Sequence, residues 1–111
     1  VTIPGVGNDV ADPAEQELAY PLVPLASLLS MFEGLGEVGP RLGDVRCPAL
    51  VMTSPQDHVV PPASSDAIAA GVGGPVERVT LERSYHVATL DYDKELIEER
   101  AVAFAQRVTA G

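Results

Sequence analysis

The chain has 111 residues, of which 46% are hydrophobic, so it is long enough to form one small globular domain. Its formal net charge is −9, and a phosphate-binding surface needs clustered Lys and Arg, so we expect no nucleic-acid partner. One cysteine excludes an internal disulfide and a multi-cysteine metal site, and no apolar run reaches the length of a membrane span. We therefore expect a cytoplasmic protein without stable membrane insertion, and we expect no cofactor and no metal.

The N-terminal third alternates between loop and helix signals. Residues 1–17 carry Pro, Gly and acids without a sustained period, which predicts a loop. Pro24 suits the first turn of a helix whose apolar stripe would be Leu25, Leu28, Leu29 and Phe32. Such a stripe is typical of a core helix, and the alternative is a lid over an apolar pocket. Glycines should end this helix (Gly34, Gly36 and Gly39), and residues 40–46 read as a polar connector.

A strand, a helix and a second strand follow with short connections. Residues 48–53 are apolar without alternation, which indicates a strand buried on both faces of a parallel sheet, and Cys47 just before them should be a small buried hydrophobe. Pro61 and Pro62 start a helix that runs to about Val72. Residues 76–82 partly alternate and carry charges, which indicates a strand near the sheet edge.

This order predicts that an acid and a histidine meet at one rim of the sheet. A strand–helix–strand unit places its two strands parallel, so their carboxyl ends lie on the same side. Asp57 follows the first strand and His86 follows the second, which makes them candidates for the acid and base of a catalytic triad. The alternatives are that Asp57 only bonds its own turn and that His86 is a loop histidine satisfied by a carbonyl.

Three other residues compete for these roles. His58 directly follows Asp57, and neighbouring residues seldom face one another, so we expect His58 at the rim of the site. Asp91 and Asp93 precede a closing amphipathic helix whose apolar face would be Leu96, Ile97, Ala101, Phe104 and Val108. Both acids suit the positive N-terminal end of that helix.

The sequence contains no candidate nucleophile. No Gly-x-Ser-x-Gly motif occurs, and none of the serines considered stands at a strand-to-helix glycine turn: Ser27, Ser30, Ser54, Ser64, Ser65 and Ser84. A nucleophile would therefore have to come from other residues.

Two stretches carry a resemblance to a known family. Residues 47–61 (CPALVMTSPQDHVVP) and residues 81–91 (LERSYHVATLD), together with the last helix, resemble the C-terminal part of an α/β-hydrolase of the bacterial carboxylesterase and monoacylglycerol lipase group. The likeness is clear over residues 45–108. It is weaker over the acidic loop, Leu18 to Tyr20 and the helix after Pro24, which resemble the end of that family's cap.

The resemblance implies an α/β fold in which residues 1–44 are the end of a cap or lid with its connector, and residues 45–111 are the C-terminal part of the core. It implies a serine hydrolase that cleaves acyl glycerols or other short to medium acyl esters, with Asp57 as the triad acid and His86 as the triad base. In that family the serine comes earlier in the chain. The partners expected are an ester with an apolar acyl chain and the N-terminal portion of the same fold, and this chain alone should be inactive.

Two alternatives stay open at this point. The same fold also supports dehalogenation, perhydrolysis and acyl transfer, and the identity of the nucleophile would separate these chemistries. The chain could also be a non-enzymatic interaction module, in which case Asp57 and His86 would point apart.

Overall fold

The computed structural model describes residues 1–110; Gly111, the last residue of the predicted core segment, lies outside the described residues. In chain order the elements are β1 (Thr2–Pro4), β2 (Leu22–Pro24), α1 (Leu25–Val38), the 3-10 helix η1 (Gly39–Asp44), β3 (Ala49–Thr53), α2 (Ala63–Gly71), β4 (Val76–Thr80), the 3-10 helix η2 (Ala88–Leu90) and α3 (Lys94–Thr109).

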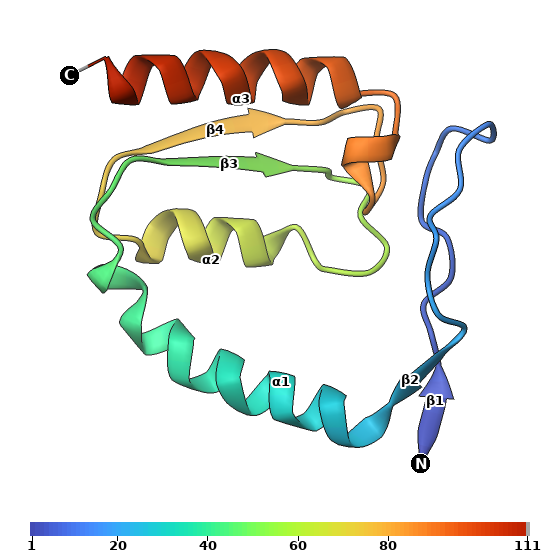
Figure 1. The fold of residues 1–111 in the computed structure, drawn as a ribbon. Helices are drawn as coiled ribbons and strands as arrows, with labels where there is room; N and C mark the ends of the chain where they lie inside the picture. Colours follow the sequence, from blue (N-terminus) through green and yellow to red (C-terminus); the bar gives the residue numbers. More distant parts are fainter. Residues whose placement is uncertain (111) are drawn as a thin grey trace.

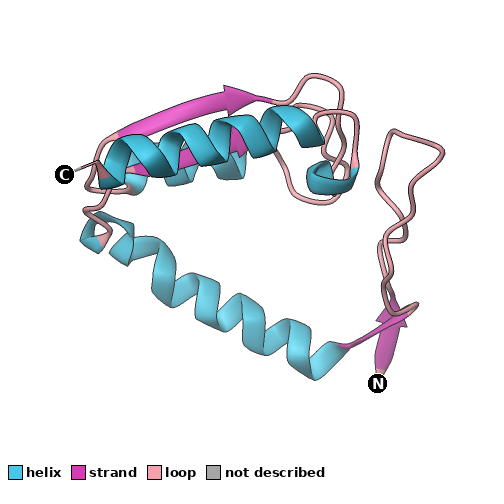
Figure 2. Cartoon of the chain, turned by 45° about the horizontal axis from the view of Figure 1, so that its top comes forward, coloured by secondary structure: helices cyan, strands magenta, loops and turns pink. Residues whose placement is uncertain are grey.

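The predicted strand–helix–strand unit is present. β3 and β4 pair in parallel, with Ala49 opposite Val76 and Thr53 opposite Thr80. Helices α2 and α3 cover opposite faces of this two-stranded sheet (Figures 1 and 2). Val79 and Leu81 are the buried apolar side chains of this layer. The carboxyl ends of both strands therefore open onto one rim, as the sequence predicted.

Burial around β3 is lower than the sequence predicted. Every residue of β3 is only partly buried, because β3 pairs with β4 alone among the described residues and its other edge has no strand beside it. Cys47 is exposed, so its expected burial is wrong. It lies in the turn before β3, where its carbonyl packs against the backbone of Gly74, and no side chain can fit at Gly74.

The N-terminal segment contains two short strands, of which β1 lies within residues 1–17, where a loop was expected. Three residues of β1 pair antiparallel with β2, and Gly5 donates to the Pro21 carbonyl just beyond the pairing (2.9 Å). Pro24 ends β2 and caps α1, so it lies one residue outside the helix. Between the two strands the chain forms a long hairpin that stands beside the carboxyl ends of β3 and β4 (Figure 1).

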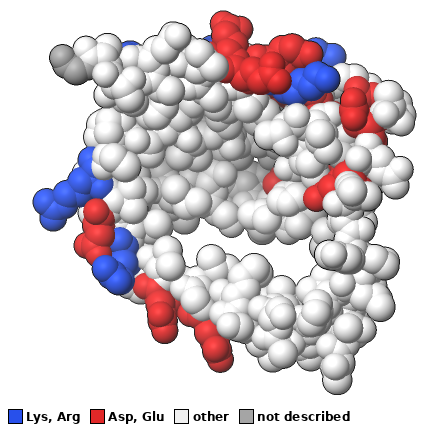
Figure 3. Space-filling model, in the orientation of Figure 1, with Lys and Arg blue, Asp and Glu red and all other residues white. Residues whose placement is uncertain are grey.

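Helix α1 is longer and more exposed than expected. It continues through Gly34 and Gly36 to Val38, since these glycines weaken a helix without ending it. No residue of α1 is buried, and Leu29 and Phe32 are 56% and 57% exposed. The core interpretation of this stripe is therefore wrong for residues 1–110. In the space-filling view an opening separates helix α1 from the layer formed by β3, β4, α2 and α3 (Figure 3). Most of the rim of this opening consists of residues other than Asp, Glu, Lys and Arg.

The closing helix α3 agrees in part with its predicted face. Leu96, Ile97 and Phe104 are partly buried, whereas Ala101 and Val108 are exposed. No helix within residues 1–110 has the length and apolar character needed to cross a bilayer.

Candidate active site

Asp57 and His86 are in direct contact. The Asp57 Oδ2 and His86 Nδ1 atoms lie 2.9 Å apart, within hydrogen-bond distance. The two side chains retain 16% and 34% of their exposure, so both are largely shielded from water. The contact follows from the parallel register of β3 and β4, which puts the loops after Thr53 and Thr80 next to one another.

Asp57 also makes the turn that the alternative interpretation proposed. Its Oδ1 accepts hydrogen bonds from the backbone N–H groups of Val59 and Val60, each at 2.8 Å. The two carboxylate oxygens thus have separate tasks: Oδ1 closes the turn and Oδ2 faces His86. The turn fixes the rotamer of Asp57, which holds Oδ2 in place before any substrate arrives.

His58 lies at the rim and pairs with a different acid. Its Nδ1 is 2.7 Å from Oδ1 of Asp9, its ring meets Tyr85 edge to face at 4.6 Å, and its side chain is 61% exposed. Asp9 was not singled out in the sequence. It stands 49 residues before His58 in a segment without periodicity, so no local signal marks it.

Asp91 and Asp93 lie at the start of α3, as predicted, but the Asp93 side chain makes no capping hydrogen bond to the helix. Asp91 is 2% exposed, and its carboxylate accepts four backbone N–H groups from Ala11, Asp12, Tyr85 and Tyr92 at 2.7 to 3.0 Å. Asp93 occupies the N-cap position but accepts from the Arg83 N–H and the Ser84 hydroxyl. Both acids instead hold the loop that carries His86, and Asp91 ties that loop to the N-terminal segment.

The same contacts lower the pKa of three carboxyl groups. Partial burial acts to raise the pKa of Asp57, but the hydrogen bonds from His86, Val60 and Val59 outweigh it, so the pKa falls below the usual value. For Asp9 burial is again outweighed, here by bonds from His58 and His86, and its pKa is lowered. For Asp91 burial is outweighed by its backbone donors, which lower its pKa. All three groups are carboxylates at neutral pH.

These lowered pKa values predict a loss of stability in acid. A carboxyl whose folded pKa lies below its unfolded pKa stabilises the fold above the unfolded value of about 3.9, and this contribution disappears as pH falls through the folded pKa. Urea unfolding of the purified protein should therefore give a free energy of unfolding that falls below about pH 5.

The variant Asp91→Asn tests the origin of that loss. The single amide oxygen of Asn can accept only some of the four N–H groups that the two Asp91 oxygens accept. We therefore expect the free energy of unfolding of the variant to be lower by about 1–3 kcal/mol at pH 7. It should also show a shallower fall between pH 5 and pH 3. An unchanged slope in the variant would show that Asp91 does not carry the effect.

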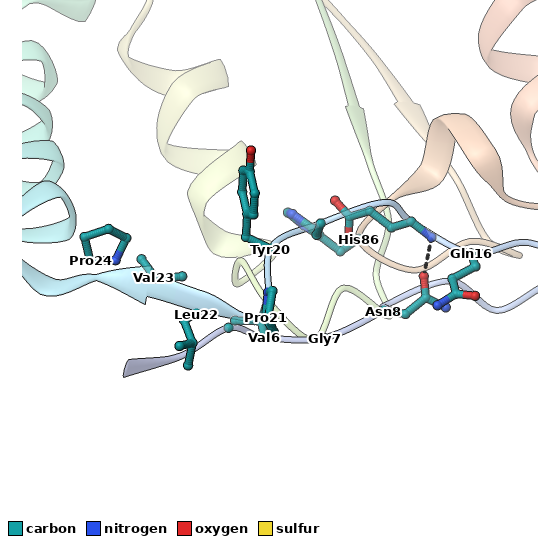
Figure 4. Close-up of a pocket in the computed structure, with 13 residues that line it drawn as sticks. Val6, Gly7, Asn8, Gln16, Tyr20, Pro21, Leu22, Val23, Pro24 and His86 are labelled. Carbon is teal, nitrogen blue, oxygen red and sulfur yellow. Dashed lines mark hydrogen bonds between the residues drawn. The ribbon is translucent and has the colours of Figure 1, made fainter. Parts of the chain in front are cut away.

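A pocket of about 650 Å³ lies between His86 and the N-terminal hairpin. In Figure 4 Asn8 and Gln16 stand at one end and Pro24 and Val23 at the other, Tyr20 and His86 lie between these ends, and Asn8 accepts the Glu17 N–H at 2.6 Å. Much of the wall is apolar, and the apolar lining residues include Val6, Tyr20, Pro21, Leu22, Val23 and Pro24. His86 therefore lines a mainly apolar space.

The described residues hold no metal cluster, and the serines nearest in sequence to Asp57 and His86, Ser54 and Ser84, are both buried. Within residues 1–110, no group of three or more His, Cys, Asp and Glu side chains could hold a metal ion. Ser84, the serine closest in sequence to His86, is fully buried and bonded to Asp93, so it is unsuited to attack a substrate.

Comparisons with known proteins agree with this architecture. The chain is 44% identical over 100 residues to a thermostable monoacylglycerol lipase from Bacillus sp. (strain H-257). The aligned region covers 89% of this chain and 40% of the lipase. A solved structure from a study of LipS and LipT, two metagenome-derived lipolytic enzymes, superposes with a TM-score of 0.90 and 43% identity over 96% of this chain and 44% of that one. The chain thus spans less than half the length of either protein. No family model matches it.

Proposed function

We propose that this chain, which is the C-terminal part of an α/β-hydrolase, supplies the acid and the base of a serine esterase whose nucleophile lies outside residues 1–111. The observation that carries the proposal is the 2.9 Å contact of Asp57 with His86 at the rim shared by β3 and β4, beside the pocket. Open α/β sheets bind their ligands at this rim.

The roles of His86 and Asp57 follow from which of their atoms face each other. His86 Nδ1 faces Asp57, which leaves Nε2 to take the proton of a serine hydroxyl as its oxygen attacks the acyl carbon. The Asp57 carboxylate holds the ring in this orientation and stabilises the imidazolium that forms. Nε2 then gives the proton to the departing alcohol, and a water repeats the sequence on the acyl-enzyme.

The apolar pocket beside His86 supports an acyl ester as the substrate. Val6, Leu22 and Val23 offer a hydrocarbon surface to an acyl chain, and the polar residues of the lining can face the ester and its alcohol. The lipolytic names of both similar proteins agree with esters of this kind. We propose acyl glycerols or other short to medium acyl esters as the substrate class.

We also propose that residues 1–44 are the end of a cap with its connector and that residues 45–111 are part of the catalytic core. The separation of α1 from the sheet layer supports this division (Figure 2). The exposed apolar face of α1 and the free edge of β3 are the surfaces that the remainder of the hydrolase fold would cover. The cytoplasmic location expected from the sequence stays a prediction.

Labelling with a fluorophosphonate probe tests the proposal. The complete hydrolase should react at one serine, and peptide mapping should place that serine outside residues 1–111. Residues 1–111 produced alone should not react, because they lack a nucleophile and oxyanion donors. Labelling of a serine within residues 1–111 would overturn the proposal, and an aspartate nucleophile in the complete protein would indicate dehalogenation instead.

A further inference from the structure

Asp9 makes contacts with both of the loops that carry the proposed acid and base. Its Oδ2 accepts the backbone N–H groups of His58 and His86, each at 3.0 Å, and its Oδ1 meets the His58 ring at 2.7 Å. Its own carbonyl oxygen accepts the Val87 N–H at 3.2 Å. One residue of the N-terminal segment thus joins the residue after Asp57 to the backbone of His86.

These contacts act on the backbone, which decides where the two side chains stand. Asp9 accepts the backbone N–H of His58, which directly follows Asp57, and it also accepts the backbone N–H of His86. The Asp9 side chain is 14% exposed and its bond to the His86 N–H is partly buried, so water cannot readily replace that bond if the carboxylate is removed. Apart from this carboxylate, the cross-links between the loops include the Asp57–His86 contact and the bond from Gln56 Nε2 to the Glu82 carbonyl at 2.9 Å.

We propose that Asp9 is a positioning residue for catalysis: it fixes the separation and orientation of the loops that carry Asp57 and His86. The inference rests on the proposed esterase function and adds a residue from the N-terminal segment to it. Asp9 does not touch the proposed reacting atoms. It acts by setting the geometry of the two residues that do.

The pocket wall should survive the loss of Asp9. Gly7 and Asn8 line the pocket just before it, but the segment is also held by Asp91, which accepts the N–H groups of Ala11 and Asp12. On the other side Gly5 is bonded to Pro21. Removing the Asp9 carboxylate should therefore lower kcat and leave KM nearly unchanged.

The test compares Asp9→Ala and Asp9→Asn with Asp12→Ala in the complete hydrolase. Asp12 is a matched control, because it is an acid of the same segment whose carboxylate, within residues 1–110, accepts only the nearby Ala14 N–H. Turnover of a p-nitrophenyl ester is divided by the number of sites that a fluorophosphonate titrates to completion, so that misfolded protein does not count.

Misplacing catalytic groups by about 1 Å costs on the order of 100-fold, so Asp9→Ala should lower kcat per titrated site by about 10- to 100-fold, with KM within about threefold. Asp9→Asn keeps one acceptor oxygen and should lose less than Asp9→Ala. Asp12→Ala should stay within about twofold of the wild type.

Two results would overturn the proposal. If kcat per titrated site in Asp9→Ala equals that of Asp12→Ala, Asp9 has no positioning role. If both Asp9 variants only reduce the number of titratable sites, the role of Asp9 is in folding alone. His86→Ala in the same assay separates the two inferences: if it retains wild-type turnover, the proposed function itself fails, whatever the Asp9 variants do.

Discussion

Replacing His86 by alanine in the complete hydrolase is expected to lower kcat by about 10⁴-fold or more, with little change in the free energy of unfolding. The size of the loss follows from the role of the base, because without it the serine hydroxyl keeps its proton during attack. Stability should change little, since the Asp57 carboxylate keeps its bonds to the Val59 and Val60 N–H groups and the backbone contacts of His86 remain. Steady-state kinetics and urea unfolding measure the two quantities.

His58→Ala is the matched control for this variant. His58 is the other histidine of the chain and has a carboxylate partner of its own, but its ring is largely exposed and faces Asp9. We expect its turnover to stay within about tenfold of the wild type. If His58→Ala were the inactive variant and His86→Ala the active one, the base would have been assigned to the wrong histidine.

Asp57→Asn should lower kcat by about 10⁴-fold while it preserves the fold. The amide oxygen of Asn can take the place of Oδ1 and still accept the Val59 and Val60 N–H groups, so the turn is kept. The amide NH₂ then stands where Oδ2 stood, and it cannot accept a hydrogen bond from the N–H group at His86 Nδ1. The ring is left in the wrong tautomer, and this change lowers kcat by about 10⁴-fold in a Ser-His-Asp triad.

Asp57→Ala separates the two tasks of this side chain. It removes the turn bonds as well as the contact with His86, so it should unfold more easily than Asp57→Asn by about 1–3 kcal/mol. Its turnover should be as low as that of Asp57→Asn. Equal stability of the two variants would show that the Oδ1 bonds to Val59 and Val60 do not support the loop.

The sheet and the pair could be predicted because their signals are local. The apolar run at residues 48–53, the prolines before α2 and the glycines after it define a strand–helix–strand unit, and parallel strands bring Asp57 and His86 to one rim. The distance between them then follows from strand spacing. Their roles as acid and base were candidates from the residue types and the shared rim, the resemblance points to the same roles, and these roles stay a proposal.

The remainder of the site depends on contacts between distant parts of the chain. Asp9 and His86 are 77 residues apart, and Asp91 and Ala11 are 80 residues apart. An acid in an aperiodic segment and an acid before a helix look ordinary in sequence, so Asp9 was missed, and Asp91 was placed at the helix start without its contacts to the two loops. The exposure of α1 and Cys47 has a similar origin, because burial depends on which surfaces lie opposite and not on apolar character alone.

The double variant Asp57→Asn/His86→Ala tests most directly whether the two residues act as one unit. If the carboxylate works only through the imidazole, the double variant should turn over as fast as His86→Ala within about threefold, because nothing is left for the acid to orient. If Asp57→Asn instead lowers kcat in the His86→Ala background by the same factor as in the wild type, the two residues act independently. That result would contradict the assignment.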